Sequence, residues 1–327
     1  MIRNSATGAL ESCDFENLVA NIPEMKQCNA SIDTVTFAQP IDSSDMDPSH
    51  WAEMVRIISV NYDLYDGFVI LHGTDTMAFT ASALSFMLEN LSKPVILTGS
   101  QLPIEAIRTD AKENMLTAIE IAAACDSLGR ALVPEVCIYF HEELIRGNRS
   151  SKISANNLAA FSSNNYPLLA HSGTEIVYHT EYIRTADPGK QFTPHYEMDP
   201  RIIIFSLFPG IQRSVVEGVL SNNSVKGVIF RTFGSGNAPE SDWLVALLSK
   251  AVRAGKIIVN ITQCATGKVQ MEKYRTGRQL LEAGIIGGYD STVEAALTKL
   301  MFLLGQNLSQ AEISRLMNVS LAGEITV

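Results

Sequence analysis

Short apolar runs alternate along the chain with longer stretches in which apolar residues recur every three or four positions. The short runs are rich in β-branched residues and predict buried strands, and the longer stretches predict amphipathic helices. This alternation is typical of parallel βαβ units. In the first half we expect strands at residues 34–37, 67–71, 95–98 and 135–140, and helices around 51–58, 78–91 and 115–124.

The pattern lapses between residues 182 and 200, and a second alternating series follows. It predicts strands at 201–207, 228–233 and 256–262, and helices at 214–220, 241–254 and 292–304. The sequence therefore predicts an α/β protein with two α/β domains. We expect a larger N-terminal domain with a doubly wound, mostly parallel sheet (1–185), a linker (186–200) and a smaller C-terminal domain with a parallel sheet (201–327).

The composition favours a small-molecule ligand. The 327 residues are 46% hydrophobic and 18% charged, which is enough to bury a sizeable core. A net charge of −10 without a lysine or arginine run argues against nucleic acid and against an anionic membrane as partners. Five cysteines without C-x-x-C spacing indicate neither a zinc site nor a disulfide framework, and favour a cytoplasmic protein with reduced thiols. No apolar stretch reaches the about 18 to 20 residues of a membrane helix.

Candidate chemistry follows the predicted strands, because ligands of parallel sheets bind beyond the strands' carboxyl ends. His72, Gly73, Thr74 and Asp75 come directly after the strand at 67–71. The other strand ends lead to Asp-Ser-Ser-Asp-Met at 42–46, to Gly-Ser-Gln at 99–101 and to the segment 146–152, which closes on Lys152. We expect these four segments to meet at one edge of the sheet.

Each segment also has a purely structural interpretation. The cluster at 42–45 would cap the helix that carries Trp51, Thr74 and Asp75 would cap the next helix, and a single lysine is usually solvated. Together, however, the residue types suit nucleophilic catalysis, since a hydroxyl needs a base that takes its proton. In such a relay Lys152 accepts from Thr74 while Asp75 orients the ammonium, and backbone amides after Gly73 stabilise an oxyanion.

Seven segments resemble those of the bacterial L-asparaginases, in particular the cytoplasmic type I enzymes. They are ILHGTDTM at 70–77, DSSDM at 42–46, LTGSQ at 97–101, GNRSSK at 147–152, GNAP at 236–239, NITQC at 260–264 and GGYDSTVEA at 287–295. The resemblance covers essentially the whole chain. It implies hydrolysis of L-asparagine to L-aspartate and ammonia through a threonine acyl-enzyme, without a metal or a cofactor.

The resemblance also implies roles for individual residues. Thr74, Asp75 and Lys152 match the catalytic Thr-Asp-Lys group, which agrees with the relay inferred from residue chemistry. The substrate's α-amino and α-carboxylate groups would be held by Asp42, Ser43 and Ser44. Asn237 would reach the pocket of a neighbouring subunit, which implies a homodimer or homotetramer with shared active sites. An allosteric asparagine site of type I enzymes is matched by Arg231, Thr262, Gln263 and Cys264.

The start of the chain departs from the family pattern. These enzymes open on a strand followed by Thr-Gly-Gly-Thr-Ile-Gly-Met, whose second threonine is the nucleophile. Here residues 1–8 predict a loop, and residues 1–3 resemble the continuation after that motif. We therefore expect the first strand and the nucleophile upstream of Met1. The alternatives are a non-catalytic relative that binds asparagine for regulation, and the amidase component of a tRNA amidotransferase, which would need an RNA-facing domain that the sequence does not display.

Overall fold

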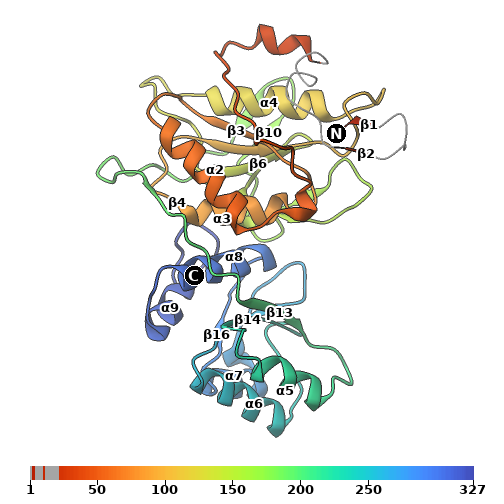
Figure 1. Cartoon of the computed structure of the whole chain (residues 1–327), viewed down its shortest axis with the longest axis vertical. Helices are drawn as coiled ribbons and strands as arrows, with labels where there is room; N and C mark the ends of the chain where they lie inside the picture. The colour runs from red at the N-terminus through yellow and green to blue at the C-terminus, as the bar shows by residue number, and fades with distance from the viewer. Residues whose placement is uncertain (1, 4–9, 12–21) are drawn as a thin grey trace. The chain divides into compact units, whose positions relative to one another are not determined.

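The computed structural model describes residues 2–3, 10–11 and 22–327 (Figure 1). The chain divides into two compact units, Met1–Tyr196 and Glu197–Val327. The first contains a six-stranded sheet and the second a four-stranded sheet, each accompanied by helices. The predicted α/β class is confirmed.

The N-terminal sheet has the strand order β11-β10-β7-β6-β5-β3. Its parallel part contains the three strands that the sequence predicted, namely β3 (Phe68–Leu71), β5 (Val95–Thr98) and β6 (Val136–Phe140). Its antiparallel part was not predicted and contains β7 (Glu143–Arg146), β10 (Ala170–Ser172) and β11 (Ile176–Tyr178). The chain reverses between β6 and β7 through His141 and Glu142, which both have positive φ, the geometry of a tight two-residue hairpin.

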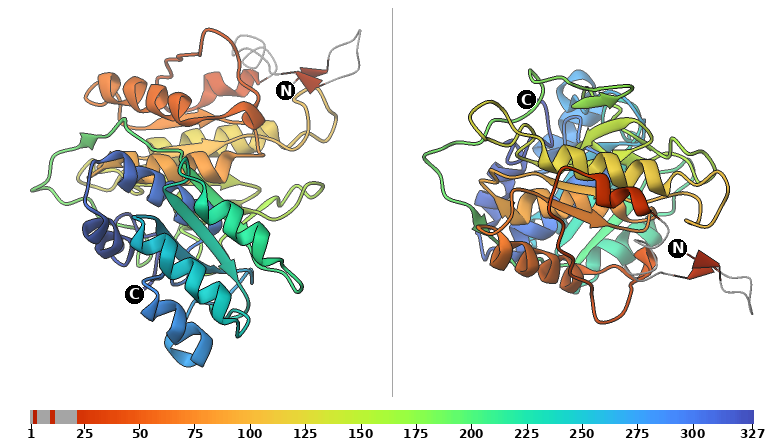
Figure 2. Two further views of the ribbon diagram at one scale, coloured as in Figure 1. Left: turned by 60° about the horizontal axis from the view of Figure 1, so that its bottom comes forward. Right: turned by 90° about the horizontal axis from the view of Figure 1, so that it is seen from above.

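Helices cover both faces of this sheet. Helix α4 (Ala111–Ala123) lies on one face, and α2 (Pro48–Asn61) with α3 (Met77–Met87) lies on the other (Figures 1 and 2). All three were predicted, although α3 ends four residues early. Its end is set by the strand β4 (Leu88–Glu89), which leaves the helix to pair with β12 (Thr193–Pro194).

The expected strand at residues 34–37 is wrong. Residues 31–36 are exposed and have no regular secondary structure, and no strand pairs with them in the described part of the chain. An apolar alternation becomes a strand only when a partner satisfies its backbone groups. As a result, β3 is an edge strand of the described sheet, with β5 as its single neighbour there.

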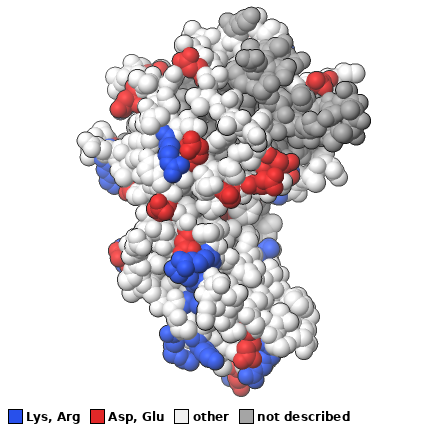
Figure 3. Space-filling model, viewed as in Figure 1, with Lys and Arg blue, Asp and Glu red and all other residues white. Residues whose placement is uncertain are grey.

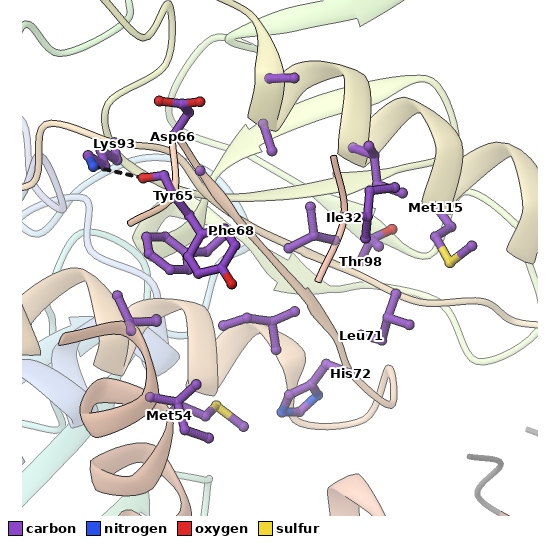
Figure 4. Close-up of a pocket in the computed structure, with 18 of the residues that line it drawn as sticks. Ile32, Met54, Tyr65, Asp66, Phe68, Leu71, His72, Lys93, Thr98 and Met115 are labelled. Carbon is purple, nitrogen blue, oxygen red and sulfur yellow. Dashed lines mark hydrogen bonds between the residues drawn. The ribbon is translucent and has the colours of Figure 1, made fainter. Parts of the chain in front are cut away.

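A cavity of about 1990 Å³ lies beside β3. Its walls come from β3 itself, from residues 29–43, and from α2 and α4, and they include the apolar side chains of Ile32, Met54 and Met115 (Figure 4). At the carboxyl end of β3 the lining becomes polar, with Ser43, Thr74, Asp75, Gln101 and Lys152. The cavity therefore runs from an apolar strand edge to the residues that the sequence singled out.

The C-terminal sheet is parallel throughout, in the order β13 (Ile202–Ser206), β14 (Gly227–Thr232), β15 (Ile257–Thr262) and β16 (Ile286–Gly287). Its helices are α5 (Arg213–Ser221), α6 (Asp242–Arg253), α7 (Arg275–Glu282), α8 (Val293–Gly305) and α9 (Gln310–Met317). The three predicted strands and three predicted helices are confirmed. The short β16, α7 and α9 were not predicted.

Two further observations concern the chain start and the surface. Ile2–Arg3 (β1) pairs antiparallel with Leu10–Glu11 (β2), where the sequence predicted a loop over residues 1–8; the remainder of that loop lies outside the described residues. None of the helices in the described ranges is long and apolar enough to cross a bilayer. On the face shown in Figure 3, acidic side chains are scattered over the N-terminal unit, and basic side chains gather on the C-terminal unit with acidic ones among them.

Candidate active site

The structure brings Thr74, Asp75 and Lys152 together, although Lys152 lies 78 positions after Thr74. Thr74 and Asp75 occupy the turn between β3 and α3, and Lys152 ends the short strand β8 (Ser151–Lys152), which pairs with β9 (Phe161–Ser162). The Lys152 Nζ donates to Thr74 Oγ1 at 2.9 Å and to Asp75 Oδ1 at 2.6 Å. The three side chains of the predicted relay are therefore in contact, with Lys152 as the donor to both partners, and their catalytic role stays a prediction.

Lys152 and Asp75 differ in their exposure to solvent. The Lys152 side chain is 19% exposed, whereas that of Asp75 is 65% exposed. A partly exposed ion pair of this kind adds little to stability, because water solvates its charges almost as well. The Lys152–Asp75 pair is thus better explained by the hydroxyl that it adjoins than by a need to stabilise the fold.

Gln101 fixes the direction of the Thr74 hydroxyl. Thr74 Oγ1 donates to Gln101 Oε1 at 3.1 Å, while Gln101 Nε2 donates to the carbonyl of Asn157 at 3.1 Å. A hydroxyl has one hydrogen and two lone pairs, so Thr74 accepts from Lys152 and donates to Gln101. The sequence located Gln101 after a strand but gave it no role.

Two buried residues at the start of α4 hold the loop that carries Gln101. The Asp110 carboxylate accepts from the backbone N–H of Gln101 at 2.9 Å and of Leu102 at 3.0 Å. Asn114 Nδ2 donates to Gly99 O at 2.9 Å and to Asp110 Oδ2 at 3.2 Å. Sequence reasoning missed Asp110 and Asn114, because residues that bind backbone groups of a distant loop leave no spacing signature.

The segment 42–45 forms a 3-10 turn, η2 (Ser43–Asp45), that Asp42 caps. The Asp42 carboxylate accepts from the backbone N–H and from the hydroxyl of Ser44, both at 2.9 Å, and these bonds, the backbone one first, lower the pKa of Asp42. The proposal that this cluster caps the helix carrying Trp51 is wrong. That cap is Asp47, whose carboxylate accepts from the first backbone amides of α2.

Ser43 is seated directly against the Thr74 turn. It is buried, and its carbonyl accepts from Thr76 Oγ1 at 2.6 Å. A Cβ on Gly73 would lie 2.5 Å from Ser43 Oγ, so only glycine lets Ser43 approach so closely. The structure therefore brings Ser43 to the Thr74, Asp75 and Lys152 group.

Asn237 lies in the C-terminal unit, between β14 and α6. Its side-chain oxygen accepts from the Thr276 hydroxyl and from the backbone N–H of Ala238. These contacts lie within the C-terminal unit. The role expected for Asn237 in a neighbouring pocket remains a prediction.

The four residues matched to an allosteric site lie near the carboxyl ends of β14 and β15. The Gln263 amide donates to the carbonyls of Leu207 at 2.8 Å and Arg231 at 3.0 Å. Thr262 Oγ1 donates to Gly234 O at 2.6 Å and accepts from the backbone N–H of Cys264 at 2.9 Å. Within the described ranges, Arg231 Nε is buried without a hydrogen-bond partner. The regulatory role of this cluster stays a prediction.

The described residues contain no group of three or more His, Cys, Asp or Glu side chains arranged to hold a metal ion. Thr74, Lys152 and Asp75 offer a hydroxyl, an ammonium and a carboxylate in contact. In acyl transfer such a group moves the proton of a nucleophile.

Two family models match the chain over most of its length. The model for the N-terminal domain of asparaginase matches residues 1–184, and the model for the C-terminal domain of glutaminase and asparaginase matches residues 201–317. The chain belongs to the asparaginase family. The fold expected from the resemblance is confirmed, and the family is hydrolytic.

The chain matches a different share of the length of each relative in the asparaginase family. The chain is 43% identical over 316 residues to L-asparaginase 1 of Escherichia coli, which covers 95% of this chain and 90% of that protein. It is 44% identical over 296 residues to the mouse 60 kDa lysophospholipase, covering 90% of this chain and 51% of that protein, so the chain spans about half the length of that relative. A glutamyl-tRNA(Gln) amidotransferase subunit of Saccharolobus solfataricus is 33% identical over 333 residues, which make up 98% of this chain and 72% of that protein.

A solved structure agrees with the sequence comparison. The crystal structure of L-asparaginase I from Vibrio cholerae matches with a TM-score of 0.87 and 42% identity, covering 97% of this chain and 94% of that one.

Proposed function

We propose that this member of the asparaginase family hydrolyses L-asparagine to L-aspartate and ammonia. One observation carries the proposal: the Lys152 ammonium bridges the Thr74 hydroxyl and the Asp75 carboxylate beside a large cavity. The likeness to proteins named L-asparaginase from E. coli and V. cholerae supports asparagine as the substrate.

The reaction is an acyl transfer in two steps. Before the reaction, the Lys152 ammonium must lose a proton to solvent, and the Thr74 hydroxyl must turn from Gln101 toward the resulting amine. The nucleophilic threonine hydroxyl then loses its proton to Thr74, whose own proton passes to neutral Lys152, and Asp75 stabilises the ammonium that forms. The threonine oxygen bonds to the side-chain amide carbon of asparagine, the C–N bond breaks, and the nitrogen takes up a proton and leaves as ammonia. Water then cleaves the β-aspartyl ester by the same relay and releases L-aspartate.

We place the nucleophilic threonine in a Thr-Gly-Gly-Thr-Ile-Gly-Met motif, which residues 1–327 do not contain, after a strand that pairs with β3. Three observations support this: β3 has one described neighbour, its other edge adjoins the cavity, and its carboxyl end leads directly into Thr74. A strand added parallel to β3 would carry the residue at its own carboxyl end to the relay. Below, the polypeptide 1–327 preceded by such a strand and the Thr-Gly-Gly-Thr-Ile-Gly-Met motif is called the motif-bearing polypeptide.

Substrate binding would fall to the turn 42–44. Ser43 lies against Gly73, and Asp42 carries a carboxylate whose lowered pKa keeps it charged, which suits an α-amino group. Ser44 would add a hydroxyl for the α-carboxylate. We also propose a cytoplasmic location, which the free thiols of Cys28, Cys125, Cys137 and Cys264 support.

The proposed site is shared between subunits of a homodimer or homotetramer, through Asn237. A mixture of Asn237→Ala and Lys152→Met subunits, both in the motif-bearing polypeptide, should then recover part of the parental activity. In one arrangement of such a hybrid, one pocket is intact and the other carries both lesions. Absence of recovery after verified subunit exchange would show that each pocket is built within one chain.

We further propose that Arg231, Thr262, Gln263 and Cys264 form a second asparagine site that regulates turnover. The buried Nε of Arg231 supports it, since a carboxylate would supply the acceptor that this group lacks among the described residues. Arg231→Leu should make the dependence of rate on asparagine concentration hyperbolic if the parent's is sigmoidal. If the rate of the parent already depends hyperbolically on asparagine concentration, the proposal is wrong.

The experiment that tests the proposed function is ammonia release from L-asparagine and L-glutamine by the motif-bearing polypeptide. We expect turnover of asparagine and little of glutamine. The likeness to the amidotransferase subunit favours a second candidate, for which ammonia release from glutamine would require aminoacylated tRNA. Thermal stabilisation by asparagine without any ammonia release would instead identify a regulatory asparagine-binding protein.

A further inference from the structure

His72 contacts the turn of the proposed site without belonging to the proton relay. It follows β3 directly, its side chain is 8% exposed, and Figure 4 shows its ring on the same side of β3 as Met54 of α2. One ring nitrogen, Nδ1, lies 2.6 Å from the carbonyl oxygen of Gly73. The other, Nε2, lies 2.9 Å from Thr80 Oγ1 in α3.

These two distances fix the protonation of the ring. A carbonyl oxygen only accepts, so a contact of 2.6 Å requires the hydrogen on Nδ1, because two lone pairs would repel each other there. On the other side, the indole N–H of Trp51 only donates, and it donates to Thr80 Oγ1 at 3.0 Å. That leaves the Thr80 hydrogen free to donate to Nε2. Both sides therefore suit a ring with its hydrogen on Nδ1 and a lone pair on Nε2.

Burial supports the same assignment, since a charged ring would lose its hydration. Removal from water lowers the pKa of His72, against the smaller effect of the Gly73 carbonyl. A proton on Nε2 would also leave the Thr80 hydrogen without Nε2 as its acceptor. The Trp51 and Thr80 side chains, from α2 and α3, thus hold His72 in one state.

We propose that His72 is a positioning residue of the asparaginase site: its Nδ1 hydrogen holds the Gly73 carbonyl and so orients the peptide that leads into Thr74. The Gly73 carbonyl belongs to the same peptide plane as the Thr74 N–H, so rotation of that plane moves the Thr74 hydroxyl relative to Lys152. Gly73 is also the residue on which Ser43 rests, and Ser43 is fixed from the other side by Thr76. The hydrogen bond from His72 Nδ1 to the Gly73 carbonyl therefore affects both the relay and the turn at residues 42–44, called the substrate turn below.

Two substitutions separate this role from ordinary core packing. The side-chain amide nitrogen of asparagine occupies nearly the place of Nδ1, whereas the amide group of glutamine reaches nearly the place of Nε2, where its oxygen can accept from Thr80. His72→Asn keeps a donor for Gly73 and loses the bond to Thr80; His72→Gln does the reverse. Both variants lose the ring, so a purely structural residue would respond to both in the same way.

In the motif-bearing polypeptide, kcat for asparagine should fall less than about ten-fold in His72→Asn, the scale of one neutral hydrogen bond. In His72→Gln it should fall about a hundred-fold, as expected for a misplaced catalytic group, with a smaller change in KM. The matched control is the same pair of substitutions at His195, whose ring bonds to Glu89, and there we expect no difference between the two. Equal losses of kcat in the two His72 variants would overturn the proposal.

The kinetic experiment rests on the proposed function, whereas the following NMR experiment does not. In ¹⁵N-labelled polypeptide 1–327 near neutral pH, NMR should find His72 neutral with the hydrogen on Nδ1, its signals being assigned by their loss in His72→Asn. The Thr74 backbone amide, which shares the Gly73 peptide plane, should shift in His72→Gln and stay near the parental position in His72→Asn. A hydrogen on Nε2, a charged ring, or the same change in the Thr74 amide shift in both His72 variants would overturn the proposal, whatever the substrate is. Absence of asparagine turnover in the parent would overturn the proposed function alone.

Discussion

The Lys152–Asp75 pair in the N-terminal unit and the Lys299–Glu324 pair in the C-terminal unit both join Nζ to a carboxylate oxygen at 2.6 Å. Their surroundings differ. The side chains of Lys299 and Glu324 are 2% and 0% exposed, whereas those of Lys152 and Asp75 are 19% and 65% exposed. Distance alone therefore does not say what an ion pair does.

The remaining hydrogen bonds separate the two pairs. Lys299 also donates to the carbonyls of Met317 and Val319, and Glu324 accepts from the backbone N–H groups of Leu321 and Ala322. Every one of these partners lies in the last eleven residues of the chain, which the pair fastens to α8. Lys152, in contrast, divides its contacts between a carboxylate and a hydroxyl at the edge of a cavity. Full satisfaction of both charges indicates a structural pair, and an accessible hydroxyl beside the pair indicates a chemical one.

The largest effect is expected from Lys152→Met in the motif-bearing polypeptide. The variant removes the group that accepts the proton from Thr74, so kcat should fall by about 10² to 10⁴-fold, the usual contribution of a general base. Its thermal unfolding should stay close to that of the parent, because the pair is partly exposed. Asparagine turnover within a few-fold of the parent would show that the relay does not exist.

Lys299→Met should have the opposite profile. It leaves the Glu324 carboxylate buried without its cation, so the free energy of unfolding should fall by about 3 to 5 kcal/mol, measured by urea denaturation. In the motif-bearing polypeptide, the turnover of asparagine per folded molecule should be unchanged by this substitution. The double variant with Glu324→Gln should regain part of the loss, since no charge is then left unpaired; a double variant less stable than the single would contradict this interpretation.

The Asp199–Arg201 pair is intermediate, with side chains 10% and 52% exposed. The Arg201 side-chain hydrogen bond, above all, lowers the pKa of Asp199 from 3.8 to about 2. Because the folded-state pKa is depressed, this stabilisation is present above pH 3.8 and is lost as the pH falls toward about 2. Asp199→Asn should therefore flatten the decline in stability over that window, by at most about 2 kcal/mol once the exposure of Arg201 is considered. Parallel acid-unfolding curves for parent and variant would contradict it.

The smallest effect is expected at the substrate turn. Ser43→Ala in the motif-bearing polypeptide removes a contact made by substrate and transition state alike, so KM should rise by about ten-fold with little change in kcat. Initial rates over a range of asparagine concentrations decide this. A loss confined to kcat would place Ser43 in the proton relay instead.

The parts of the fold and site that the sequence predicted share one property: their signal is local. β3, β5 and β6 are unbroken apolar runs, and Thr74 and Lys152 come at places where strand patterns end. The strand expected at 34–37 was wrong because its alternation says nothing about whether a partner strand lies beside it. Asp110 and Asn114 escaped notice for a related reason, since they act on backbone groups of residues 99–102 that any sequence possesses.

The antiparallel half of the N-terminal sheet was hidden in a different way. Its β7 follows a turn in which His141 and Glu142 have positive φ. Glycine and asparagine, the residues that usually indicate such a turn in a sequence, do not occur there. Likewise, the part that His72 plays depends on Trp51 and Thr80, which only the folded chain brings to its ring.

Our central proposal is that Thr74, Lys152 and Asp75 relay the proton of a nucleophilic threonine in the Thr-Gly-Gly-Thr-Ile-Gly-Met motif, which residues 1–327 do not contain. The most direct test is the rate of ammonia release from L-asparagine by the polypeptide 1–327, by the motif-bearing polypeptide and by its Thr74→Val variant. We predict little or no release by the first, substantial release by the second, and a loss of about 10² to 10⁴-fold in the third. Substantial hydrolysis by residues 1–327 alone would mean that Thr74 or another hydroxyl of this chain is the nucleophile, and Thr74→Val within a few-fold of its parent would mean that the relay does not carry the proton.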